Sequence, residues 1–224
     1  MNNIQTLLNS FQLSTEAIVK NRIVMAPLTR SMADDNLVPT EEMAAYYGRR
    51  ADAGLIITEA TLISQQGQGY PNTPGLYSEE QILGWKNVTK RVHQNGGKIF
   101  AQLWHTGRVS HPVYHNGNLP MAPSAVALHG EVPRLTGLEY GVPRQMSLIE
   151  IRKVINQYVL AAISAMKAGF DGVEIHGANG YIIDQFLHWD TNRRKDNYGG
   201  SVENMTRFLL EILDEVKTVV PAEK

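Results

Sequence analysis

A short polar cluster around residue 176 combines side chains that could bind an oxyanion and deliver a proton. His176, Asn179 and Tyr181 directly follow a β-prone run, residues 172–175, which indicates a strand that leads into a site. Glycines at positions 177 and 180 permit tight turns, so the imidazole, the amide and the phenol could face one small volume. Spacing alone leaves a second interpretation open, an ordinary strand end whose His and Asn bind turn carbonyls.

The elements predicted around this cluster alternate between strands and helices. After a hairpin within residues 11–19, the expected strands are residues 22–26, 55–60, 98–103 and 172–175. The expected helices are residues 39–53, 78–95, 147–168 and 201–219. Two of these helices start at capping boxes, Ser78 with Gln81 and Ser147 with Glu150. Repeated strand–helix pairs favour a parallel sheet of βαβ units over a sandwich or a helical bundle.

Polar side chains gather where the predicted strands end. They are Thr29, Gln102, His105, His176, Asn179 and Tyr181. In a (β/α)8 barrel this edge is the active-site face, and an open doubly wound sheet also binds its ligands there. A dinucleotide-binding Rossmann half fits less well, because the glycines at positions 67 and 69 are followed by Tyr70 and Pro71 rather than by a helix.

The composition favours a globular protein with a small-molecule partner. The 224 residues are 43% hydrophobic, and 21 basic side chains face 22 acidic ones, for a net charge of -1. This balance provides no electrostatic footprint for nucleic acid or for an anionic membrane. The sequence contains no cysteine, and we find neither a signal-peptide pattern nor an apolar run long enough to span a bilayer. We therefore expect a cytoplasmic protein without nucleic-acid or membrane partners.

Five blocks of the sequence, in order and in register, resemble the old yellow enzyme family. They are residues 21–30 (NRIVMAPLTR), 59–61 (EAT), 102–108 (QLWHTGR), 176–181 (HGANGY) and 196–204 (DNYGGSVEN). Each block alone is a weak signal, but together they span nearly the whole chain. The family consists of oxidoreductases that use flavin mononucleotide (FMN) on a (β/α)8, or TIM, barrel. The resemblance therefore implies an α/β fold of this class.

The resemblance also implies a site for non-covalently bound FMN and for an electron-poor alkene. The implied FMN-binding residues are Pro27, Leu28, Thr29, Ala60, Gln102 and His176. The implied substrate-binding residues are Trp104, Tyr70, His176 and Asn179. Among them, Thr29 would bond a flavin carbonyl and Gln102 the pyrimidine edge of the flavin. Tyr181 would be the proton donor.

The implied reaction takes hydride from NADH or NADPH and reduces the C=C bond of an α,β-unsaturated carbonyl compound. Hydride can add to the β-carbon only if negative charge builds on the carbonyl oxygen, and His176 and Asn179 would stabilise that charge as paired donors. Tyr181, a phenol that is neutral at pH 7, would protonate the α-carbon. FMN supplies the hydride chemistry. The nicotinamide would dock in the same pocket in a first half-reaction, so no dinucleotide-binding fold is required.

Three residues outside this interpretation, His105, His111 and His115, could be proposed as metal ligands. They lie in a predicted loop without helical spacing and without a partnering carboxylate, so we expect no metal site. Thr29 and Gln102 taken alone would be an ordinary strand-end hydroxyl and an ordinary interior amide. Their assignment depends on the family resemblance.

Only four of the eight strands of a TIM barrel are predicted in this sequence. We expect residues 1–224 to form one partial barrel domain, an N-terminal hairpin plus about four βα units, without the C-terminal half that would bind the FMN phosphate. The alternative function is therefore a truncated or split half-barrel that binds FMN weakly and is inactive alone. Its open strand edges would favour self-association or a complementing C-terminal half. Inward-facing side chains, such as those of Val24, Ile57 and Phe100, would lack an opposite wall.

Overall fold

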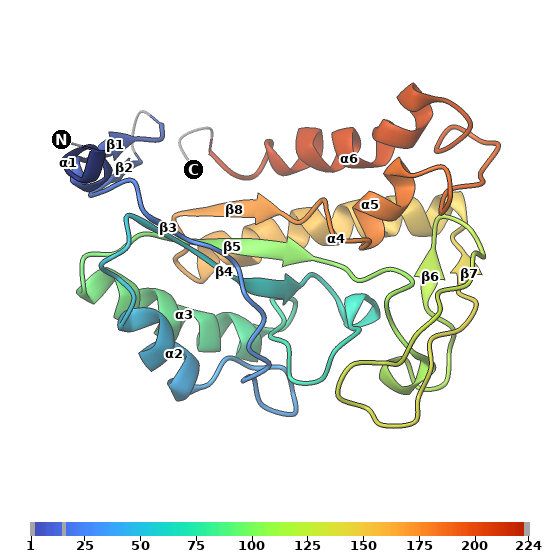
Figure 1. Ribbon diagram of the computed structural model, residues 1–224, viewed down its shortest axis with the longest axis horizontal. Coiled ribbons are helices and arrows are strands. Elements are labelled where there is room, and N and C mark those ends of the chain that lie inside the picture. Colours follow the sequence, from blue (N-terminus) through green and yellow to red (C-terminus); the bar gives the residue numbers. More distant parts are fainter. Residues whose placement is uncertain (1–2, 15–16, 222–224) are drawn as a thin grey trace.

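The computed structural model of the protein describes residues 3–14 and 17–221. A four-stranded parallel sheet in the order β3-β4-β5-β8 runs through its centre (Figure 1). The strands are β3 (Val24–Met25), β4 (Leu55–Leu62), β5 (Ile99–Trp104) and β8 (Gly172–Ile175). The predicted parallel sheet is confirmed, although β3 is shorter than predicted because only Val24 and Met25 pair with β4.

The long helices begin at the predicted caps. They are α2 (Glu41–Gly48), α3 (Glu79–Gln94), α4 (Leu148–Lys167) and α6 (Val202–Val216). Both predicted capping boxes are present, and Thr40 and Ser201 cap α2 and α6. The helix α2 ends at Gly48, earlier than predicted, and the chain turns before β4.

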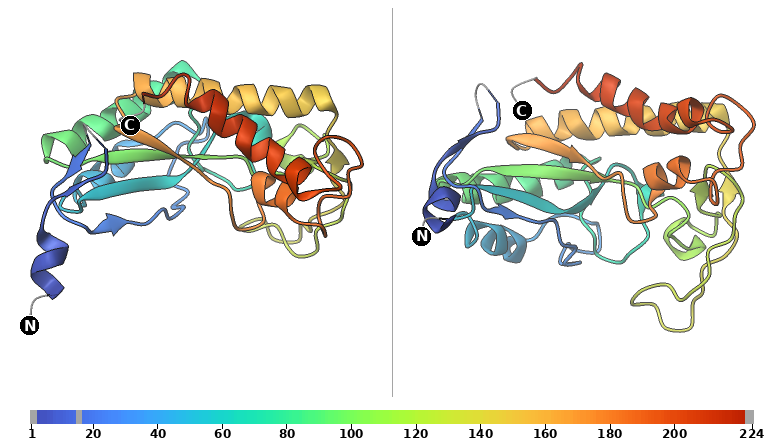
Figure 2. Two further views of the ribbon diagram at one scale, coloured as in Figure 1. Left: turned by 90° about the horizontal axis from the view of Figure 1, so that it is seen from above. Right: turned by 45° about the horizontal axis from the view of Figure 1, so that its top comes forward.

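The main hydrophobic core fills the space between one face of the sheet and these helices (Figure 2). The sheet contributes Ile56, Ile99, Ala101 and Leu103, all fully buried. The helices contribute large side chains, among them Tyr47, Trp85, Tyr158 and Phe208. Burial of an aliphatic side chain contributes about 1.5–3 kcal/mol, so this layer holds the strands in place.

A β-bulge changes the direction of the side chains along β4. Ile57 pairs with Phe100, but the next pair is Ala60 with Gln102, so β4 has one extra residue between the two pairs. Ile57 and Ala60 consequently face the same side of the sheet, away from the helices. Glu59 lies on the helix side, where it contacts Tyr47.

The N-terminal elements partly cover the opposite face of the sheet. They are α1 (Asn3–Leu8), which was not predicted, and the predicted hairpin of β1 (Phe11–Gln12) and β2 (Ile18–Val19). Part of the predicted hairpin, residues 15–16, lies outside the described residues. Val19 packs against Leu55 and Ile57, and Ile57 is only 5% exposed. The expectation that Ile57 lacks cover was wrong, because the hairpin supplies it, whereas Val24 is 54% exposed.

Several short elements surround the carboxyl ends of the strands. The helix α5 (Ile182–Leu187) and the parallel pair β6 (Met121–Ala122) and β7 (Arg144–Gln145) were not predicted. Two 3₁₀ turns, Gln65–Gly67 and Pro112–Tyr114, lie in the connections that follow β4 and β5. Among the described residues, no helix is long and apolar enough to cross a membrane.

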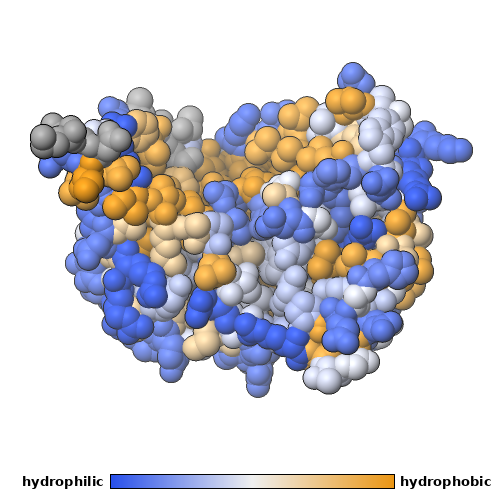
Figure 3. Space-filling view, viewed as in Figure 1, coloured by the Kyte–Doolittle hydropathy of each residue, from blue (hydrophilic) through white to orange (hydrophobic). Residues whose placement is uncertain are grey.

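Both edge strands of the sheet have a neighbour on one side only within the described residues. An apolar groove of about 440 Å³ lies beside the free edge of β8, and Val173, Ile175, Leu213 and Val216 line it. Figure 3 shows hydrophobic surface over the N-terminal elements, and Leu7, Phe11 and Ile18 of these elements are exposed. The free edge of β8 and the N-terminal elements therefore present uncovered apolar surface.

Candidate active site

A cavity of about 430 Å³ opens at the carboxyl ends of the strands. Its walls contain every predicted site residue except Tyr70: Pro27, Leu28, Thr29, Ala60, Gln102, Trp104, His176, Asn179 and Tyr181. Tyr70 lies next to this wall, because its phenol is 3.0 Å from that of Tyr181 and its ring packs on Trp104. The chain thus brings the predicted residues together in space.

His176 lies directly after β8, where the main chain still bonds to β5. Its N–H donates to the carbonyl oxygen of Leu103 at 3.0 Å, which fixes the backbone before the turn. The ring Nδ1 accepts from the N–H of Ala178 at 3.3 Å, so the neutral ring carries its proton on Nε2. Burial lowers the pKa of His176 against the opposing effects of Glu174 and Asp184. The side chain is therefore a neutral hydrogen-bond donor at pH 7.

Asn179 sits in a tight turn that α5 holds in place. Its φ of 59° is left-handed, and Gly180 follows with a φ of 75°. The N–H of Gly180 donates to Asp184 Oδ2 at 2.7 Å, and its carbonyl oxygen accepts from Gln185 Nε2 at 2.7 Å. The Asn179 amide has no hydrogen bond to any described residue, so both its donor and its acceptor remain for a ligand.

Tyr181 completes this wall as the N-cap residue of α5. Its ring meets Trp104 and His176 edge to face, with centroids 4.9 and 5.0 Å away. Burial, and then the phenol of Tyr70, raises the pKa of Tyr181. The phenol therefore keeps its proton through the neutral range, as a proton donor must until the moment of transfer.

The facing wall comes from the segment that follows β3. Pro27, Leu28 and Thr29 line it together with Ala60 of β4. The hydroxyl of Thr29 is half-buried and has no hydrogen bond to a described residue. Ala60 faces the cavity because of the bulge in β4, and its small side chain leaves room for a planar group.

Glu174 belongs to this site and was missed by the sequence analysis. Gln102 Nε2 donates to Glu174 Oε1 at 2.7 Å, and both residues line the cavity. This bond orients the Gln102 amide so that its oxygen is free to accept. Period-two alternation places Glu174 on the same face of β8 as His176, so the position could have been predicted once the strand was assigned.

The three histidines considered as metal ligands are engaged separately. His105 is fully buried and its Nδ1 accepts from the N–H of Gly107, while His115 Nε2 lies 2.7 Å from Ser110 Oγ. His111 Nδ1 accepts from the N–H of Val113. No group of three His, Cys, Asp or Glu side chains suited to a metal ion occurs among residues 3–14 and 17–221.

Comparison with known proteins assigns the chain that forms this cavity to a family. The profile of the NADH:flavin oxidoreductase / NADH oxidase family matches residues 7–224. A probable flavin mononucleotide-dependent alkene reductase of Leishmania infantum is 47% identical over 215 residues, which are 92% of this chain and 58% of that protein.

Solved structures agree with the sequence match. An old yellow enzyme homologue from Zymomonas mobilis superposes with a TM-score of 0.93 at 47% identity, over 97% of this chain and 61% of that one. Morphinone reductase in complex with tetrahydroNAD superposes with a TM-score of 0.89 at 44% identity, over 97% of this chain and 61% of that one. This chain thus spans 58% to 61% of the length of these three relatives. It belongs to the NADH:flavin oxidoreductase / NADH oxidase family, and its sheet corresponds to part of the TIM barrel found in these neighbours.

Proposed function

We propose that the protein is an FMN-dependent oxidoreductase that takes hydride from NAD(P)H and reduces the C=C bond of α,β-unsaturated carbonyl compounds. One observation carries the proposal. The Nε2–H of His176, the free amide of Asn179 and the phenol of Tyr181 meet in one cavity, opposite the wall formed by residues 27–29. That arrangement offers two donors to an oxygen and one proton to a neighbouring carbon.

The unsatisfied groups of the cavity suit FMN. The Thr29 hydroxyl and the Gln102 amide oxygen have no hydrogen-bond partner among the described residues, and both face the space beside Pro27, Leu28 and Ala60. A heteroaromatic ring with carbonyl and N–H groups on its edges fits such a wall. When bound there, FMN supplies hydride transfer, which no side chain of the protein can perform.

His176 and Asn179 bind and polarise the carbonyl oxygen of the substrate. Preorganised donors stabilise negative charge as it develops, and each typically contributes on the order of 3 kcal/mol to the barrier reduction. The local hydrogen bonds of both residues fix them in advance: Ala178 holds the His176 ring, and Asp184 and Gln185 hold the turn at Asn179.

Tyr181 transfers its phenolic proton to the α-carbon as the β-carbon receives hydride. The C=C bond is thereby reduced, and the phenolate left behind takes up a proton from solvent. Tyr70, 3.0 Å away, can donate to that phenolate while the charge persists. Trp104 packs against both rings and limits the directions in which they can move.

A double replacement tests this proposal on the FMN-loaded protein. His176→Ala combined with Asn179→Ala should lower the rate of 2-cyclohexenone reduction by NADPH by at least about 100-fold, since both donors to the oxygen are lost. The control is His111→Ala in the loop after β5, which should leave the rate unchanged. Undiminished turnover in the double variant would remove His176 and Asn179 from the reaction.

The open edges of the sheet favour a second candidate function. The chain by itself would be an inactive or weakly flavin-binding partner that requires further βα units to complete its barrel. The uncovered groove beside β8 and the exposed Val24 on β3 support this candidate. The visible flavin absorbance of the purified, desalted chain separates the two, because a yellow protein supports the enzyme and a colourless one supports the incomplete partner.

A further inference from the structure

Glu59 is a buried carboxylate on the helix side of β4, outside the cavity. It is only 1% exposed. Its Oε1 accepts from the phenol of Tyr47 at 3.0 Å, and its own N–H donates to the same phenol oxygen at 2.8 Å. No salt bridge joins it to a cation among the described residues, so the carboxylate depends on neutral donors.

The second oxygen of this carboxylate binds the segment that carries Thr29. Glu59 Oε2 accepts from the main-chain N–H of Arg30 at 3.1 Å. Ser31, the next residue, has a left-handed φ of 54°, and its backbone also lowers the pKa of the Glu59 carboxyl. The hydrogen bond from Arg30 thus ties the peptide directly after Thr29 to the carboxylate.

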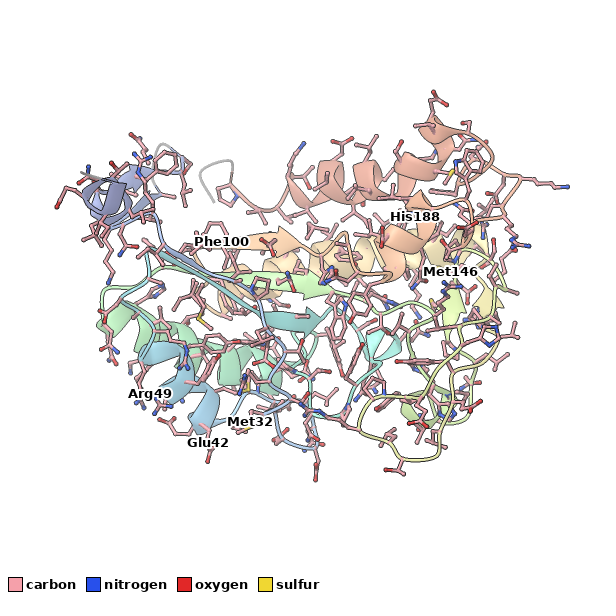
Figure 4. All side chains as sticks on the ribbon, viewed as in Figure 1. Met32, Glu42, Arg49, Phe100, Met146 and His188 are labelled. Atoms are coloured by element: carbon pink, nitrogen blue, oxygen red, sulfur yellow. The ribbon has the colours of Figure 1, made fainter. Side chains whose placement is uncertain are left out.

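Packing alone holds this segment weakly. A cavity of about 240 Å³ lies behind it. Its lining comprises Arg30 and Met32 of the segment, Glu42, Met43 and Tyr46 of α2, Arg49 directly after α2, and Glu59 itself. Figure 4 shows Met32, Glu42 and Arg49 placed around α2. The Arg30 guanidinium lies 5.5 Å from the Tyr46 ring, an exposed contact of small energy. Without the carboxylate the segment has space to relax backward.

The placement of a carboxylate here is costly for folding. Removing a charge from water is unfavourable, and burial accordingly raises the pKa of Glu59, against hydrogen bonds from Arg30, Tyr47 and Ser31 that lower it. A hydrophobic side chain of similar volume is often neutral or stabilising at such a site. A function in orienting the segment accounts for a residue that stability alone does not favour.

We propose that Glu59 is a positioning residue for the flavin site: its carboxylate, oriented by Tyr47, anchors the main chain at Arg30 and so holds the Thr29 hydroxyl toward the cavity. The inference rests on the proposed function, since Thr29 matters only if a flavin binds there. Glu59 itself touches neither the active-site cavity nor the ligand. Its effect should therefore appear in binding and redox potential through Thr29.

Glu59→Gln tests the anchor with little change in shape. The amide can accept on one side only, so either Tyr47 or the Arg30 amide loses its acceptor. In the protein without FMN, the amide hydrogen of Arg30 should exchange with solvent about tenfold faster, as measured by NMR. In the FMN-loaded protein, the dissociation constant for FMN should rise about tenfold and the midpoint potential of the bound flavin should shift.

Two further variants sharpen the result. Tyr47→Phe removes only the hydroxyl that orients the carboxylate. It should change the amide exchange rate, the dissociation constant for FMN and the midpoint potential in the same direction as Glu59→Gln, by a smaller factor. In a Thr29→Ala background, Glu59→Gln should add nothing to the shift in potential, because its effect passes through that hydroxyl. The control is Glu79→Gln, an exposed acid on α3 without a hydrogen bond to a described residue, which should behave as the parent protein.

The outcomes separate this inference from the proposed function. If the parent chain binds FMN and Glu59→Gln keeps the parent exchange rates, affinity and potential, the inference is overturned. If the parent chain binds no FMN, the proposed function of the chain alone fails, and the inference fails with it because Thr29 then has no flavin to orient. If Glu59→Gln does not fold, the Tyr47→Phe measurements decide, with parent values again overturning the inference.

Discussion

Single side chains in the cavity divide the proposed reaction between binding and proton transfer. His176 is neutral and donates from Nε2, because the N–H of Ala178 occupies Nδ1. Tyr181 retains its proton, because burial and Tyr70 raise the pKa of its phenol. Neither residue needs a permanent charge, so the cavity can bind a neutral enone and stabilise charge only as the charge forms.

This division predicts the effect of Tyr181→Phe on the two half-reactions. Reduction of bound FMN by NADPH requires no proton from the phenol and should keep its rate. Reduction of the alkene should slow by at least about 100-fold, the usual contribution of a positioned general acid. Stopped-flow absorbance measures the two steps separately. Tyr77→Phe, whose phenol bonds Gln65 outside the cavity, is the control, and equal slowing of both steps would make Tyr181 a structural residue.

The buried His105, which lies outside the cavity, should make the stability of the protein depend on pH. Burial lowers the pKa of His105 from 6.5 to about 3. The unfolded chain therefore takes up this proton first as the pH falls, and the free energy of unfolding should decrease between about pH 6.5 and pH 3. His105→Asn keeps an acceptor for the N–H of Gly107 but cannot titrate, so its stability should depend less on pH across this window.

Urea unfolding at several pH values measures that slope. The control is His129→Asn, an exposed histidine that should retain the parent pH dependence. An unchanged slope in His105→Asn would mean that other groups, such as His115 and His176, account for the loss of stability in acid.

The sequence indicated some of these residues better than others. His176, Asn179 and Tyr181 could be singled out as candidates because they lie close together after a strand, although spacing alone left an ordinary strand end as an alternative. Thr29 and Gln102 lie far from them in sequence and needed the family resemblance. Glu59 received no role, because the bulge that turns it toward α2 leaves no trace in the pattern of residue types.

At the scale of elements, length decided what could be predicted. The long helices α3 and α4 show periodicity and capping boxes over many residues. The six-residue helix α5 and the two-residue strands β6 and β7 are too short to show a period. Yet α5 supplies the side chains that hold the turn at Asn179, so an element invisible in the sequence positions a predicted residue.

The cap of α4 gives a prediction at this scale. Ser147 accepts from the N–H of Glu150, whose side chain accepts in turn from the N–H of Ser147. Ser147→Ala should lower the free energy of unfolding by about 1 kcal/mol, the usual cost of losing such a cap. Ser164→Ala in the interior of the same helix is the control and should leave stability equal or slightly higher. Equal urea midpoints for the parent and Ser147→Ala would contradict the prediction.

At the scale of the whole molecule, repeated strand–helix pairs were enough to predict a parallel sheet of βαβ units. The cover that β1 and β2 provide for Ile57 could not be predicted in the same way, since it depends on how the hairpin folds back over distant strands. The positions of residues on the inner face of the sheet followed from alternation only up to the bulge in β4.

The open edges of the sheet predict how the chain behaves in solution. Edge strands offer unpaired main-chain groups to other chains, and Val24 on β3 adds an exposed apolar side chain. The chain alone should therefore self-associate as its concentration rises. Val24→Lys should reduce this association, because a charged side chain on an edge strand opposes pairing.

Light scattering after size-exclusion chromatography measures the mass directly. Leu83→Lys replaces a residue of α3 that is 64% exposed, away from the sheet edges, and should associate as the parent does. A monomeric parent chain at all concentrations would show that the edges are already protected.

The bulge in β4 has a further consequence for how this segment can vary. With regular alternation after Ile57, the same residues would turn the methyl group of Ala60 toward the helices and the carboxylate of Glu59 into the cavity. A second carboxylate, in addition to that of Glu174, would then face the place proposed for the flavin ring and oppose the negative charge that the ring would gain on reduction. Thus the number of residues between Ile57 and Ala60 determines which side chains face the cavity, and insertions or deletions there should be tolerated less well than substitutions.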